Sequence, residues 1–174
     1  MFEGWDSFYV VLGTAAGGLI GLLFVVVTLS NSRDRERALR AVSIYMTPTA
    51  VNFGLVVATS AVALAPLRTV VATALVLGVG ALAATANAVW ACLAIRAGGP
   101  GATTPHWSDF WLYGAAPLFL CVALVGSDVA LLVHANWAET SISFLLLGLL
   151  LLGIRNAWDL VTWMSAQRNA ADPP

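Results

Sequence analysis

Five long apolar runs alternate along the chain with short stretches rich in polar, glycine and proline residues. A helix rises 1.5 Å per residue, so about 20 apolar residues cross the roughly 30 Å hydrocarbon core of a bilayer. The expected fold is all-α, a polytopic transmembrane helical bundle that forms one domain over residues 1–168, followed by a disordered tail over 169–174. The predicted transmembrane helices cover residues 8–29, 48–65, 69–95, 109–133 and 137–160.

The composition supports a membrane location. Hydrophobic residues make up 60% of the chain and charged residues 10%, whereas soluble domains have about 45–50% and about 25%. Too few polar residues remain to cover the exterior of a soluble protein of this size. The net charge of −1 provides no basic field, so nucleic acid is excluded as an expected partner.

The arginines are divided unevenly between the two sides that five crossings define. Seven lie on the side of the C-terminus, and Arg68 alone lies on the other. Loops rich in arginine stay in the cytoplasm, which predicts an N-terminus outside and a C-terminus inside. The tryptophans fall near the two expected interfaces, as an aromatic belt requires.

The most polar segment, residues 31–45, follows the first run. Its apolar residues recur at helical spacing, which predicts a short amphipathic helix on the membrane surface. It either binds anionic lipid or a partner protein, or serves only to set the topology. Its cytoplasmic basic patch consists of Arg33, Arg35, Arg37 and Arg40.

Glycines recur every fourth residue on the first predicted helix, at Gly13, Gly17 and Gly21. Small residues let membrane helices approach closely, and van der Waals contact then holds them together. This glycine zipper predicts either packing within one chain or a seam between copies or partners.

Three polar residues lie within the predicted spans, namely Asn52, Asn87 and Asp128. Polar groups in the bilayer are costly and often functional, so together they form a candidate polar path. Interhelical hydrogen bonding for Asn87, and contact with water near the outer surface for Asp128, are the alternatives. Pro117 leaves the carbonyl of Tyr113 without its helical partner, which permits a kink.

Arg155 and Asp159 are four residues apart on the fifth predicted helix and should share one face. With Asn156 and the nearby tryptophans they predict a collar at the inner boundary of the membrane. The alternative is an anchoring role only, in which the arginine side chain reaches toward the interface.

Residues for common catalytic mechanisms are missing. The two histidines, His106 and His134, are predicted on opposite sides of the membrane, and Asp128 has no second acid at its depth. The usual hydrolase and phosphate-loop motifs do not occur in the sequence. We therefore expect no enzyme, no catalytic residue, no metal and no cofactor.

A family resemblance rests on two segments of the sequence. They are WDSFYVVLGTAAGGLIGLLFVVV, Trp5 to Val27, and NAWDLV, Asn156 to Val161. They resemble a family of small bacterial multi-pass membrane proteins that is frequent in actinobacteria. Some of its members are labelled modulators of the FtsH protease. The resemblance implies a bacterial inner-membrane location and brings no catalytic residues with it.

These observations predict a non-enzymatic membrane protein that acts through helix–helix association. It would work as a homo-oligomer or as an accessory subunit of a membrane complex, with the lipid bilayer around it. The alternative is a small oligomeric ion channel or transporter whose path includes Asp128.

Overall fold

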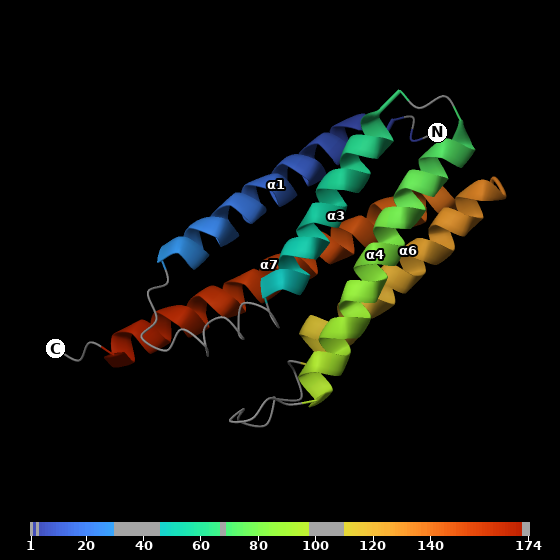
Figure 1. Ribbon diagram of the computed structural model, residues 1–174. Coiled ribbons are helices and arrows are strands. Elements are labelled where there is room, and N and C mark those ends of the chain that lie inside the picture. The colour runs from blue at the N-terminus through green and yellow to red at the C-terminus, as the bar shows by residue number, and fades with distance from the viewer. Residues whose placement is uncertain (1, 3, 30–45, 67–68, 98–109, 172–174) are drawn as a thin grey trace.

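The computed structural model describes residues 2, 4–29, 46–66, 69–97 and 110–171 (Figure 1). In these residues the chain is helical apart from short connections, and no strand occurs among them. The helices are α1 (Asp6–Leu29), α3 (Thr47–Leu64), α4 (Val70–Ala97), the π-helix η2 (Phe110–Ala115), α6 (Ala116–Leu132) and α7 (Ala138–Ala171).

Five of these segments are long and apolar enough to cross a membrane, with η2 and α6 forming one of them. This confirms the all-α fold class and the five predicted spans, whose bounds agree with the helices within two residues except at the end of α7. There the prediction needs a correction, because α7 continues to Ala171 and residues 169–171 are helical. Helix formers such as Ala and Gln follow Leu160, and no glycine or proline occurs before Pro173.

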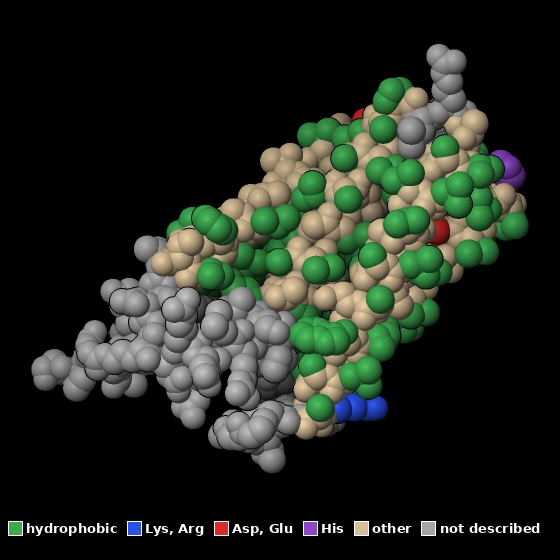
Figure 2. All heavy atoms as spheres, in the orientation of Figure 1, with side chains coloured by type: hydrophobic (Ala, Val, Ile, Leu, Met, Phe, Trp, Pro, Cys, Tyr) green, Lys and Arg blue, Asp and Glu red, His purple; other side chains and the backbone are tan. Residues whose placement is uncertain are grey.

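The outer surface of the bundle is apolar. Large side chains such as Phe24, Phe119 and Trp158 are each about 70% exposed, at 69%, 72% and 70%. Figure 2 shows hydrophobic side chains spread over α1, α3, α4 and α6, with few charged ones among them. Water would solvate such a surface poorly, whereas lipid tails match it. The chain is therefore a multi-pass membrane protein.

The helices form a ring in which each packs on the next, in the order α1, α3, α4, α6 and α7, and α7 closes the ring on α1. Helices α3 and α7 also contact each other across the ring. Figure 1 shows α1 close to α3 at one end and diverging from it toward the other. The core includes Phe53 on α3 and Ile142, Leu146 and Leu149 on α7, all fully buried.

Helices α3 and α6 end, and α1, α4 and α7 begin, at one end of the bundle, which we call the hairpin end (Figure 1). Between α6 and α7 the backbone turns at His134, which has φ 56°. The N–H of His134 donates to Leu131 O at 3.1 Å and that of Ala135 to Ala130 O at 3.0 Å. These bonds cap the last carbonyls of α6 in the manner of a Schellman motif, with histidine in place of the usual glycine.

Candidate functional site

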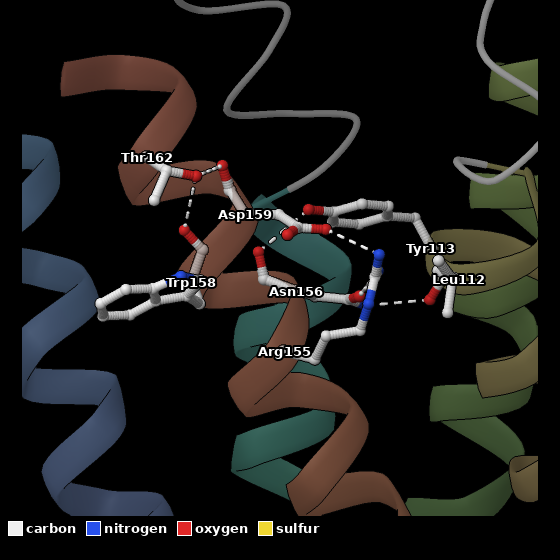
Figure 3. A network of polar contacts seen from close by, with 7 residues as sticks. All are labelled: Leu112, Tyr113, Arg155, Asn156, Trp158, Asp159 and Thr162. Atoms are coloured by element: carbon white, nitrogen blue, oxygen red, sulfur yellow. Dashed lines mark hydrogen bonds and ion pairs between the residues drawn. The ribbon is translucent and has the colours of Figure 1, made fainter. Parts of the chain in front are cut away.

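The clearest polar network lies at the end of the bundle opposite the hairpin end (Figure 3). Asn156 of α7 is 2% exposed, and its Nδ2 donates to the carbonyl oxygen of Leu112 at 2.9 Å. The hydroxyl of Tyr113 donates to the carbonyl oxygen of Asn156 at 2.9 Å. Two hydrogen bonds therefore connect α7 to η2.

Pro117 explains why the carbonyl of Leu112 needs a side-chain partner. In a π-helix a carbonyl pairs with the N–H five residues later, which for Leu112 is position 117, and proline has no N–H. The irregularity expected from Pro117 is therefore present, but it takes the form of the π-helix Phe110–Ala115. The carbonyl that receives the compensating bond is that of Leu112, one residue before the predicted Tyr113.

Arg155 and Asp159 share one face of α7, as their spacing predicts. Arg155 Nη2 and Asp159 Oδ2 form an ion pair at 3.0 Å, with the two side chains 45% and 44% exposed. A longer contact of 3.4 Å joins Arg155 Nη1 to Asn156 Oδ1. Exposed ion pairs of this kind contribute little stability. The hydrogen bond between α7 and η2 comes from the buried Asn156. Its position beside Arg155 in an apolar helix was the only sequence signal for that role.

Asp128 lies near the hairpin end of α6 and is only 4% exposed. Neither of its carboxyl oxygens has a hydrogen-bond partner among the described residues. A carboxylate in this state is costly inside a membrane. The chemistry available to this group is to hold a proton or a small cation.

Serine hydroxyls connect α6 to α7 beside Asp128. Ser127 Oγ donates to the carbonyl oxygen of Ala123 at 3.0 Å, so it accepts the 2.8 Å hydrogen bond that it shares with Ser141 Oγ. The hydroxyl of Ser127 is thus engaged as both donor and acceptor, and it forms no hydrogen bond with Asp128.

The structure does not bring the three residues of the candidate polar path to one level. At 1.5 Å per residue, Asp128 lies about 6 Å from the hairpin end of α6, Asn52 about 18 Å along α3 and Asn87 about 25 Å along α4. Asn52 is buried and Asn87 is half-buried. The Nδ2 of Asn87 has no partner among the described residues.

The glycines of α1 divide into two groups. A Cβ on Gly13 would lie 3.0 Å from Cβ of Ser60 on α3, so the two helices touch closely there. A Cβ on Gly17 would lie 4.0 Å from Val57, and one on Gly18 or Gly21 would meet no atom of the described residues within 4 Å. Gly13 therefore packs within the chain, whereas Gly18 and Gly21 contact none of the other described helices.

The remaining predicted site lies outside the described residues. It is the basic patch of residues 31–45, with Arg33, Arg35, Arg37 and Arg40.

Sequence reasoning missed one contact between α1 and α7. Tyr9 is fully buried, and its hydroxyl lies 2.8 Å from Ser143 Oγ. Ser143 Oγ donates its own proton to the carbonyl oxygen of Glu139, so Tyr9 is the donor of this pair. The backbone N–H of Phe2 also donates to Glu139 Oε2 at 2.7 Å, which attaches the start of the chain to α7.

Comparisons with protein-family models, curated proteins and solved structures found no significant match to this chain.

Proposed function

We propose that this protein is a non-enzymatic membrane protein that acts through helix–helix association, as a homo-oligomer or as an accessory subunit of a larger complex. The association surface is the outward face of α1, which contains Gly17, Gly18 and Gly21. The observation that supports the proposal is that a Cβ added at Gly18 or Gly21 would meet no atom of the described residues within 4 Å, although Gly21 belongs to the glycine row that packs on α3 at Gly13.

Helix α1 is the least enclosed of the five spans. Only 17% of its apolar window is buried inside the bundle, against 28–44% for the other four. Helix α1 diverges from α3 toward its second half (Figure 1), where the side chains of Leu22 and Phe24 are exposed. A partner helix can approach the backbone closely at Gly18 and Gly21, since neither has a side chain to keep it away.

Large apolar side chains flank this glycine face. Leu22, Phe24 and Val25 are all exposed on α1. They would pack around a helix seated on Gly21, and dispersion contacts of this kind hold membrane helices together where no hydrophobic force acts between them. The glycines provide the close approach and the larger residues provide the contact area.

Orientation and location complete the proposal. The chain would lie in a bacterial cytoplasmic membrane with its N-terminus outside, because the predicted inner side carries most of the arginines. Three of these, Arg96, Arg155 and Arg168, belong to the described helices and lie on α4 and α7 toward the end opposite the hairpin end.

The test compares two glycines that are equally open but lie on different helices. Gly21→Leu on α1 should dissociate the oligomer or release the partner, measured by native mass spectrometry of protein extracted gently from its membrane. Gly126→Leu on α6 is the matched control, since a Cβ at Gly126 would also meet no atom within 4 Å in the described part of the chain. An assembly that survives Gly21→Leu as well as it survives Gly126→Leu contradicts the proposed surface.

A second candidate function is the passage of a proton or small cation, and the unpartnered carboxyl of Asp128 favours it. Flux into proteoliposomes would be compared for the unaltered protein and for Asp128→Asn. A flux that Asp128→Asn abolishes supports transport. An unchanged flux removes Asp128 from the path.

A further inference from the structure

A groove of about 350 Å³ runs along the lipid-facing surface between α4 and the η2–α6 segment. Its walls are apolar apart from the thiol of Cys92 and the guanidinium of Arg96. Phe119 and Val122 are exposed beside it, at 72% and 53%. Its lining includes Cys92, Arg96, Phe110, Leu118, Phe119 and Val122.

Arg96 is the one charged residue among the described residues that line this groove. Its guanidinium carbon lies 4.7 Å from the centre of the Phe110 ring. This cation–π contact places the guanidinium over the ring. No acidic side chain among the described residues pairs with Arg96, whereas Arg155 is engaged by Asp159. Arg96 is thus an exposed cation that has no acidic partner in the described part of the chain, and its guanidinium can bind an oxyanion in a bidentate manner.

We propose that this groove binds an anionic phospholipid, with the phosphate on Arg96 and one acyl chain along Leu118, Phe119 and Val122. The length of the helix that lines the groove is close to the thickness of one leaflet of the hydrocarbon core. From Phe110 to Val122 the helix extends at most about 18 Å, and half of the hydrocarbon core is about 15 Å thick. Arg96 lies in the last turn of α4, where a lipid headgroup would be.

The charge selects the class of lipid. Basic pockets between transmembrane helices bind anionic headgroups, and the phosphate and Arg96 are of opposite sign. The choline of a zwitterionic lipid would add a second positive charge near Arg96. A free phosphate ion would use only Arg96 and leave the apolar groove unfilled, so the groove indicates a lipid. The proposal is independent of the association surface on α1, which is on another helix.

The experiment uses the full-length protein, stripped of lipid in detergent and titrated with phosphatidylglycerol or phosphatidylcholine of identical acyl chains. Bound lipid is counted by native mass spectrometry. We expect phosphatidylglycerol to bind about fivefold more tightly, the effect of one arginine near an anionic headgroup. Arg96→Gln should bring this ratio close to one. Arg155→Gln, the matched control, should leave it unchanged, because the Arg155 guanidinium is already paired.

A second variant tests the acyl chain. Val122→Trp should fill the groove and lower the retention of both lipids, and the smaller Val122→Phe serves if the tryptophan variant does not fold. Inorganic phosphate should not displace the lipid. The proposal is overturned if the unaltered protein retains both lipids equally, if Arg96→Gln keeps the preference, or if filling the groove leaves lipid retention unchanged.

Discussion

Asn156 on α7 donates a hydrogen bond of 2.9 Å from its side-chain amide to the backbone carbonyl of Leu112 in η2. The amide occupies the place of the N–H that Pro117 lacks, so a side chain from one helix completes the backbone hydrogen bonding of another. Asn156 is 2% exposed, so water does not reach this position easily. The π-helix is therefore tolerated because α7 lies against it.

Replacing Asn156 by Leu should destabilise the fold. The carbonyl of Leu112 would lose its donor in a buried position, at a cost of about 1–2 kcal/mol. Unfolding in a denaturing detergent would measure this. Asp159→Asn is the control, since it breaks only the half-exposed ion pair with Arg155 and should change stability by less than about 0.5 kcal/mol. Equal effects of the two changes would contradict the assigned role of Asn156.

Replacing Gly153 by Ala should be more harmful than its small size suggests. The added Cβ would lie 2.5 Å from Cε1 of Phe53, whose ring is fully buried. Relieving such an overlap costs about 1–3 kcal/mol, which thermal unfolding in detergent would detect. The double variant with Phe53→Leu should recover part of the loss. Gly148→Ala is the control, because its nearest contact would be an ordinary 3.6 Å to Leu120.

Tyr9 and Ser143 should be energetically coupled. Their hydroxyls are 2.8 Å apart and are the polar link between the buried faces of α1 and α7. A double-mutant cycle of Tyr9→Phe and Ser143→Ala should give a coupling of about 0.5–1.5 kcal/mol. Additive effects of the two substitutions would show that the hydrogen bond contributes nothing measurable.

Replacing Asp128 by Val should stabilise the protein. The change removes a buried carboxyl whose two oxygens have no partner among the described residues, and such a group costs about 1–3 kcal/mol. Thermal unfolding would measure the gain. A loss of stability instead would mean that the carboxyl holds a cation or another partner, which would favour the second candidate function.

The spans could be predicted from the sequence because each helix must be long and apolar enough to cross the lipid, whatever the other helices do. Every transmembrane segment needs about 20 apolar residues and closes most of its backbone hydrogen bonds internally. This requirement concerns only residues that are neighbours in the sequence, so the five apolar runs were sufficient to locate the helices. Apart from the end of α7, the helices begin and end close to the predicted limits. Arg155 and Asp159 could be paired for the same reason, since the spacing of four residues lies within one helix.

The contacts between helices were decided only by the tertiary structure. In a soluble helix an apolar stripe identifies the buried face, but these helices are apolar on all sides because lipid and core favour the same residues. Nothing local therefore distinguishes Gly13, which packs on Ser60, from Gly21, at which a Cβ would meet no described residue within 4 Å. Asn156 and Asp128 look alike as polar residues in apolar helices. The packing of α7 on η2 gives Asn156 a partner, whereas Asp128, near the hairpin end of α6, has none among the described residues.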